Sequence, residues 1–310
     1  MPSGMQDRLT GVLCATITPF HGEGRALDLD GIQLNTRWLL EHGLEVLIVN
    51  GTIGEATSMS ADEQGQVIDA TARAARGGAI LISGCIGADA VGVEVLAKRA
   101  IEAGTDALLV QAPATIARSP QASIEFFYAI GAAIERPYLV YNNPASNQAE
   151  LDPEALAQIA RSPQFIGLKD ATLDVMRFSE ISERFADQFP VIAAAEDSLL
   201  FTLVAGASAC MTATAAFAPG LLNSLVASVG RGDLVEARAL FMRVQAFRRL
   251  FRARLRRGER AFIPYTKAAV ELSGGRAGPP RPPLSEITPA ERDELSRVMS
   301  DEMDLQVVPS

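Results

Sequence analysis

The chain has 310 residues, with 28 basic and 37 acidic side chains, a net charge of −9 and a hydrophobic content of 48%. This composition excludes a disordered or collagen-like chain and is typical of a globular protein. The negative charge argues against sequence-independent binding to nucleic acid, because such binding needs a positive surface.

The cysteine pattern and two segments, residues 1–10 and 198–230, narrow the class of protein further. Cys14, Cys85 and Cys210 form no C-x-x-C pair, so we expect no disulfide framework and no metal site, and a reducing, cytoplasmic compartment. Residues 1–10 are polar and do not resemble a secretion signal. Residues 198–230 carry no charge and have the length of a membrane span, but glycines and a proline interrupt them. We predict a buried strand and helix there, and no membrane contact.

Short apolar runs alternate with helical segments along the chain and predict eight strands. The runs are nearly continuous in apolar residues, as in parallel strands that are buried on both faces. They are Val12–Ile17, Leu44–Asn50, Ala79–Ser83, Ala107–Gln111, Tyr138–Tyr141, Phe165–Lys169, Val191–Ala195 and Ala209–Thr212. Eight strand–helix units by about residue 230 predict an α/β fold, a (β/α)₈ TIM barrel over residues 1–230.

Capping signals mark where several helices begin. Ser60 and Glu63 form a capping box, in which each side chain can bond the other residue's backbone N–H. Ser119 and Asp152 each precede a proline that suits the first helical position. The segment 288–291, Thr-Pro-Ala-Glu, combines both signals near the C-terminus.

The sequence changes character after Gly230, since residues 231–260 contain ten arginines. Apolar residues recur there at helical spacing, which predicts an amphipathic helix packed on the barrel with a solvated arginine face. These residues are Leu240, Val244, Phe247, Phe251 and Leu255. A surface for nucleic acid or an acidic partner is the alternative. A loop over 273–283 and a helix over 289–299 complete a predicted C-terminal helical extension, residues 231–310.

Lysine is rare in this chain, which has Lys98, Lys169 and Lys267 against 25 arginines. Lys98 is expected to be a solvated charge, and no role is predicted for Lys267. Lys169 ends a strand, and catalytic residues of such barrels lie at the C-terminal strand ends. Burial there favours the neutral amine, which can form a Schiff base with a carbonyl, whereas arginine cannot. The alternative is a lysine paired with Asp170 in a surface turn.

Two other strand ends carry groups suited to the same chemistry. Tyr141 ends the fifth strand, where its hydroxyl could move a proton to or from a carbonyl adduct; a rim aromatic is the alternative. The second strand ends in residues 50–55, Asn-Gly-Thr-Ile-Gly-Glu. Gly51 and Gly54 permit close backbone approach, and successive N–H groups can form a nest for a carboxylate. An ordinary turn is the alternative there.

Four motifs stand in a fixed order along the chain. They are Gly11-Val-Leu…Thr18-Pro19-Phe20, Gly51-Thr-Ile-Gly-Glu55, Tyr141-Asn-Asn-Pro144 and Gly167-Leu-Lys-Asp170. This set resembles the dihydrodipicolinate synthase / N-acetylneuraminate lyase family from Gly11 to the C-terminal helices. The resemblance implies a (β/α)₈ barrel with a C-terminal helical extension, a homotetramer or a dimer, and Schiff-base chemistry on pyruvate or another 2-keto acid. It implies no metal and no organic cofactor.

The resemblance also assigns roles by motif position. It implies that Lys169 is the Schiff-base lysine and that Tyr141 is the proton-relay tyrosine. Thr52 and Ile53 match the paired hydroxyl residues that hold the keto-acid carboxylate, and Thr52 is also a catalytic candidate. Gly51 belongs to the same carboxylate-binding turn.

Three departures from the family pattern bear on the second substrate. Ile53 replaces the second hydroxyl residue, and its backbone N–H is what remains for the carboxylate. Thr115 stands where synthases carry a relay tyrosine that reaches a neighbouring subunit. Ser146 stands where synthases carry an arginine for the second substrate's carboxylate, and loss of such a bidentate partner costs a few kcal/mol.

These departures argue against a genuine dihydrodipicolinate synthase and favour a catabolic aldolase. A 2-keto-3-deoxy acid dehydratase or deaminase that uses the same lysine is the first alternative, and a barrel that binds a small carboxylate without catalysis is the second. Ile53, Ala114, Ile116 and Met211 predict a pocket of low polarity, which suits an apolar or aromatic aldehyde.

Overall fold

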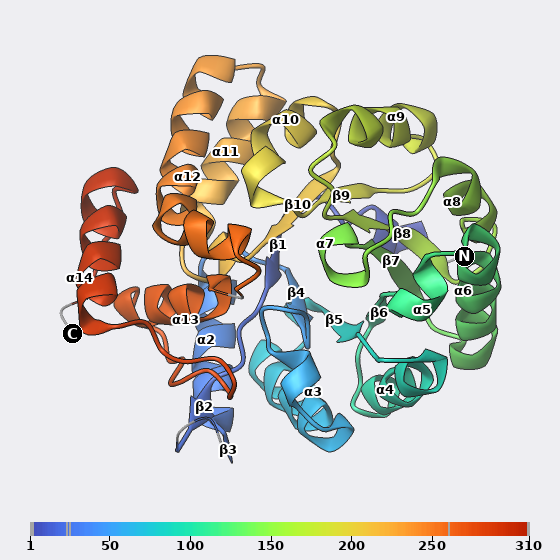
Figure 1. Cartoon of the computed structure of the whole chain (residues 1–310), viewed down its shortest axis with the longest axis horizontal. Coiled ribbons are helices and arrows are strands. Elements are labelled where there is room, and N and C mark those ends of the chain that lie inside the picture. The colour runs from blue at the N-terminus through green and yellow to red at the C-terminus, as the bar shows by residue number, and fades with distance from the viewer. Residues whose placement is uncertain (1–2, 23, 25, 260, 309–310) are drawn as a thin grey trace.

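The computed structural model describes residues 3–22, 24, 26–259 and 261–308, and its centre is a closed barrel of parallel strands (Figure 1). The strand order around the barrel is β1-β10-β9-β8-β7-β6-β5-β4. The bounds are β1 Gly11–Ala15, β4 Val46–Val49, β5 Ile80–Cys85, β6 Ala107–Val110, β7 Tyr138–Asn142, β8 Phe165–Asp170, β9 Val191–Ala193 and β10 Ala209–Thr212. Each strand overlaps one predicted apolar run, so the predicted TIM barrel is confirmed.

Helices surround the barrel, and those between consecutive barrel strands return the chain to the start of the next strand (Figure 1). They are α1 Ser3–Gln6, α2 Leu29–Glu41, α3 Ala61–Ala75, α4 Ala90–Glu102, α5 Ala114–Ala117, α6 Pro120–Ile134, α7 Pro144–Asn147, α8 Pro153–Ile159, α9 Val175–Phe185, α10 Leu199–Val204 and α11 Pro219–Gly230. The predicted caps are confirmed: Ser60, Ser119 and Asp152 each accept a hydrogen bond from a backbone N–H of the first turn. These caps fix where the helices that follow the loops begin.

The uncharged segment 198–230 folds as predicted, into α10, β10 and α11, which pack into the barrel wall. Within the described part of the chain, no helix is long and apolar enough to cross a membrane. The three cysteines are free and buried, and burial raises the pKa of Cys85 and Cys210 to about 12. Their thiols therefore stay protonated at neutral pH.

One element was not predicted, an antiparallel hairpin of β2 (Phe20–His21) and β3 (Ala26–Leu27) that follows β1. Each of its strands has two residues, which is too short to give an alternating pattern. The hairpin contacts the C-terminal extension, because the backbone N–H of Phe20 donates to the carbonyl of Ala277 at 3.0 Å.

The C-terminal extension consists of α12 Leu234–Arg256, α13 Phe262–Leu272, α14 Pro289–Arg297 and a π-helical turn, Val298–Glu302. Figure 1 places these helices together on one side of the barrel. The predicted capping box at Thr288 is confirmed. Arg260 and residues 1–2 and 309–310, which the sequence predictions included, lie outside the described residues. The division of the chain at residue 230 stays a prediction.

The predicted amphipathic helix is confirmed as α12, but its arginines are not all solvated. The side chain of Arg248 is 15% exposed, and its Nη2 lies 2.8 Å from Asp197 Oδ2. The acidic pair Glu196 and Asp197 follows β9 and faces this helix, and Arg252 also contacts Asp197 at 3.0 Å. The ion pairs join α12 to the barrel, which hydrophobic periodicity alone does not predict.

Glu63 offers a test of how the extension stabilises the barrel. Its carboxylate lies against the Arg281 guanidinium, whose hydrogen bonds hold the pKa of Glu63 at about 2, below its ordinary value of 4.5. We expect Glu63→Gln to lower the free energy of unfolding at pH 7 by about 1–2 kcal/mol. Because the pKa is lowered in the folded chain, this difference is complete above pH 4.5 and shrinks as the pH falls toward 2.

Urea unfolding of both proteins at steps between pH 7 and pH 3 measures the difference. Glu102→Gln is the matched control, since Glu102 is exposed and lies 4.0 Å from its nearest arginine nitrogen. A difference that stays constant across the range would contradict the assignment to the Glu63 charge.

Candidate active site

The ends of β7 and β8 bring Tyr141 and Lys169 side by side. In the register of the two strands Tyr141 pairs with Lys169, and Asn142 pairs with Asp170. Successive side chains of a strand point to opposite faces, so Tyr141 and Lys169 share one face and the other two share the opposite face. Lys169 Nζ lies 4.0 Å from the centroid of the Tyr141 ring, and both residues are 7% exposed.

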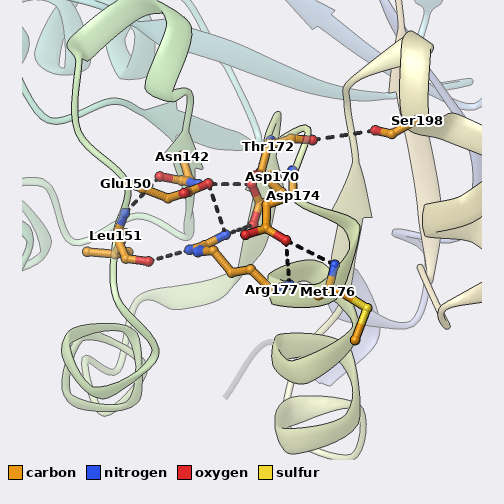
Figure 2. Close-up of polar contacts among 9 residues, drawn as sticks. All are labelled: Asn142, Glu150, Leu151, Asp170, Thr172, Asp174, Met176, Arg177 and Ser198. Atoms are coloured by element: carbon orange, nitrogen blue, oxygen red, sulfur yellow. Dashed lines mark hydrogen bonds and ion pairs between the residues drawn. The ribbon is translucent and has the colours of Figure 1, made fainter.

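The opposite face of the same two strands carries a buried polar network, drawn in Figure 2. Asn142 Nδ2 donates to Asp170 Oδ1 at 2.9 Å, and Arg177 Nη1 donates to Asp170 Oδ2 at 2.7 Å. The Asp170 carboxylate therefore takes its positive partner from α9 and not from Lys169. This arrangement excludes the alternative of a Lys169–Asp170 pair in a surface turn.

Arg177 also ties the strand ends to the loop before α8. Its second Nη donates to the carbonyl of Leu151, whose own N–H donates to Asn142 Oδ1 at 3.0 Å (Figure 2). Asp174 caps α9 by accepting from the N–H groups of Met176 and Arg177. The network closes a ring of contacts around the ends of β7 and β8, which fixes the strands that carry Tyr141 and Lys169. The sequence analysis did not identify Arg177, because a loop and a helix start separate it from Asp170.

The Tyr141 hydroxyl has one partner in the described chain. Asn143 Nδ2 donates to the phenol oxygen at 2.8 Å. A phenol can accept and donate at once, so this contact leaves its proton available to an acceptor in the barrel mouth. Asn143 follows the β7 end within the Tyr-Asn-Asn-Pro motif, and its contact orients the hydroxyl that the sequence singled out.

The glycine turn after β4 lies across the barrel from Lys169. In the eight-stranded ring, β4 and β8 are four strands apart in either direction. The left-handed backbone positions of the turn are Asn50 and Glu55, at φ 55° and 57°, and not its two glycines. Gly54 is closely packed instead, because a Cβ there would lie 3.1 Å from the carbonyl oxygen of Thr16. Beside Gly51 there is open space.

The two residues between these glycines differ in burial. Thr52 is partly exposed, whereas Ile53 is 4% exposed and belongs to the hydrophobic core. The Ile53 side chain is therefore packed into the protein, and the Thr52 hydroxyl remains the accessible polar side chain of this pair.

The remaining sequence-predicted residues lie in the barrel wall or in short helices that follow strands β6 and β7. Met211 is buried in β10, two strands from β8 and in register with Leu13. Thr115 is exposed in α5 after β6, and Ser146 is exposed in α7 after β7. Ser146 Oγ donates to Gln111 Oε1 at 3.2 Å. An uncharged hydroxyl–amide pair thus stands at the position where the family pattern has an arginine.

Among the described residues, no group of three or more histidine, cysteine, aspartate or glutamate side chains could hold a metal ion.

Comparison with known proteins gives one consistent family. Residues 8–302 match the Dihydrodipicolinate synthetase family. A 4-hydroxy-tetrahydrodipicolinate synthase from Methanoculleus marisnigri is 30% identical over 291 residues, which are 93% of this chain and 98% of that protein. A dihydrodipicolinate synthase from Acinetobacter baumannii, crystallised with pyruvate, is 25% identical at a TM-score of 0.85 and covers 95% of this chain and 99% of its own. The Aquifex aeolicus synthase shares the fold at a TM-score of 0.86, with 24% identity and coverage of 97% and 100%.

Proposed function

The chain belongs to the dihydrodipicolinate synthetase family, whose named relatives are lyases, and from this premise we propose that it works through a Schiff base between Lys169 and pyruvate or a related 2-keto acid. The observation that carries the proposal is the buried contact of Lys169 Nζ with the Tyr141 ring, 4.0 Å away, at the carboxyl ends of β8 and β7. Active sites of this barrel type lie at that end. The pyruvate bound to the Acinetobacter baumannii relative supports the choice of substrate class.

The glycine turn binds the substrate carboxylate in this proposal. The Thr52 hydroxyl and the backbone N–H groups of residues 52–54 donate to the carboxylate. The position of the turn opposite β8 favours this role. Ile53 contributes its N–H alone, since its side chain is buried. The keto acid then spans the mouth, with its carboxylate at the turn and its C2 carbonyl toward Lys169. Met211 of β10 forms part of the apolar wall.

The covalent step begins when the neutral amine of Lys169 attacks C2 and forms a carbinolamine. Loss of water gives a protonated imine, with Tyr141 donating the proton that the departing oxygen needs. With a 4-hydroxy-2-keto acid bound, the Tyr141 phenolate takes the proton of the C4 hydroxyl while the electron pair of the C3–C4 bond moves into the imine, which releases an aldehyde and leaves an enamine. Proton transfer from Tyr141 to C3 and attack of water on C2 then release pyruvate and return the free amine of Lys169. The face of the Tyr141 ring stabilises the positive nitrogen by about 0.5–2 kcal/mol.

Two residues favour an aldolase over a genuine 4-hydroxy-tetrahydrodipicolinate synthase. Ser146 cannot form the bidentate contact with a carboxylate that arginine forms, and its hydroxyl is already bonded to Gln111. Thr115 offers no phenol for a relay between subunits. We therefore assign the second substrate as an aldehyde without a carboxylate at that position. The family resemblance supports, as part of the same proposal, a cytoplasmic homotetramer or dimer. The dehydratase or deaminase of a 2-keto-3-deoxy acid is the second candidate, favoured by the same lysine.

Borohydride trapping tests the Schiff base. We expect sodium borohydride with pyruvate to yield a covalent adduct that peptide mass mapping places on Lys169, because reduction of the imine makes its bond permanent. Borohydride without a keto acid is the control. The absence of any adduct with every 2-keto acid tried would leave the non-catalytic, carboxylate-binding barrel as the better interpretation.

A substrate panel separates the reaction types. Pyruvate release from 2-keto-3-deoxy acids identifies an aldolase, and a dehydrated or deaminated keto acid identifies the alternative. Formation of 4-hydroxy-tetrahydrodipicolinate would overturn the aldolase assignment.

A further inference from the structure

The third lysine of the chain, Lys267, is buried where the C-terminal extension meets the barrel. It lies in α13 and is 2% exposed. Its Nζ donates to the carbonyl of Thr18 at 2.8 Å and to Glu55 Oε1 at 3.0 Å, and it lies 4.5 Å from the centroid of the Phe20 ring. Burial lowers the pKa of Lys267, and the Glu55 carboxylate opposes that effect. An ammonium buried at this depth persists only when it is paired.

Glu55 is the last residue of the glycine turn and receives two contacts from the extension. Its Oε1 accepts from Lys267, and its Oε2 accepts from the backbone N–H of Arg281 at 2.7 Å. The Glu55 side chain is 1% exposed. Its backbone is left-handed, at φ 57°, a conformation that costs a residue other than glycine about 1–2 kcal/mol. Such a conformation persists where the surroundings fix it, and here the two contacts from the extension fix it.

Thr18 gives the same lysine a second path to the turn. The Thr18 hydroxyl donates to the carbonyl of Gly54 at 2.7 Å, while the Thr18 carbonyl accepts from Lys267. Within the turn, the N–H of Glu55 donates to the carbonyl of Thr52 at 3.2 Å. The peptide planes of residues 52–55 are thus held at two points, the Gly54 carbonyl, which accepts from Thr18, and the Glu55 side chain. Lys267 donates to both Thr18 and Glu55.

We propose that Lys267 is a positioning residue for the substrate carboxylate, acting through Glu55 and Thr18 to orient the N–H groups of residues 52–54. The inference rests on the proposed function, in which this turn binds the carboxylate of a 2-keto acid. Lys267 itself contacts the turn and not the reacting atoms. The C-terminal extension is therefore part of the binding site, although every candidate catalytic residue lies in the barrel.

The test measures how the rate of borohydride trapping on Lys169 depends on pyruvate concentration. We expect Lys267→Met to raise the half-saturating pyruvate concentration about tenfold or more, while trapping at saturating pyruvate still modifies Lys169. Because this variant leaves the Glu55 carboxylate buried and unpaired, it is compared with the double variant Lys267→Met/Glu55→Gln. The double variant has two neutral side chains and no buried unpaired charge, so we expect a melting temperature near that of wild type. It should keep the raised half-saturating pyruvate concentration, since neither side chain then holds the turn.

Lys98→Met is the matched control, because Lys98 is an exposed lysine paired with Glu94 on the surface. We expect this variant to leave the dependence of the trapping rate on pyruvate concentration unchanged. A folded double variant with wild-type half-saturation would overturn the positioning role and leave the proposed function intact. Wild-type protein that forms no adduct would overturn the proposed function itself, so the two failures are distinguishable.

Discussion

Replacing Lys169 with arginine is expected to abolish turnover, lowering kcat by about 10⁴-fold or more, while the protein stays folded. Arginine keeps the positive charge and the contact with the Tyr141 ring, which lies 4.0 Å from the lysine nitrogen in the wild type. It cannot lose its proton and so cannot form an imine. The measurement is kcat on the best substrate of the panel, with circular dichroism and thermal unfolding to confirm the fold.

Two comparisons make this result specific to Lys169. Lys98→Arg changes an exposed lysine by the same chemistry and should keep wild-type activity. Borohydride should modify the wild type and the Lys98 variant but leave Lys169→Arg unlabelled. If Lys169→Arg retains near-normal turnover, the Schiff-base mechanism is wrong.

Tyr141→Phe should lower kcat by about 10²–10³-fold and change the half-saturating pyruvate concentration by less than about threefold. Phenylalanine keeps the ring face beside Lys169 and removes the hydroxyl that accepts from Asn143. The loss is therefore confined to proton transfer. Single-turnover rates of imine formation, followed by borohydride quenching, separate this step from substrate binding.

Tyr128→Phe is the matched control, since Tyr128 is 39% exposed and its hydroxyl donates to the carbonyl of Gln158. It should leave the rate unchanged. An unaltered rate for Tyr141→Phe would reassign the proton relay, with Thr52 as the next candidate.

The barrel could be predicted from the sequence because its strands are buried on both faces. Runs such as Leu44–Asn50 and Ala107–Gln111 are nearly continuous in apolar residues, unlike the alternating pattern of an amphipathic surface strand. Lys169 stood out for a related reason, as a scarce amine at the end of such a run. Composition and spacing reflect the local environment of a residue. The burial of a strand and a lysine at the end of that strand are both local features.

The contacts that hold the site together are not local, and the sequence did not predict them. Lys267 lies 249 residues from Thr18 and 212 from Glu55, and no periodicity relates them. The left-handed positions of the glycine turn fall on Asn50 and Glu55, where residue type alone favours the glycines. Arg177 meets Asp170 because α9, which Asp174 caps, begins at Val175 and brings the Arg177 side chain back to the end of β8. Each of these depends on the tertiary path of the chain.

The lysine in α13 has a consequence for the order in which the protein matures on the ribosome. Strand β10 ends at Thr212, so a nascent chain halted between residues 212 and 267 already contains every barrel strand. It still lacks the ammonium that pairs with Glu55, so the carboxylate at the end of its glycine turn has no lysine partner. With Lys267 positioning the turn as proposed, we expect chains that end before α13 to contain Lys169 but to bind the keto acid weakly.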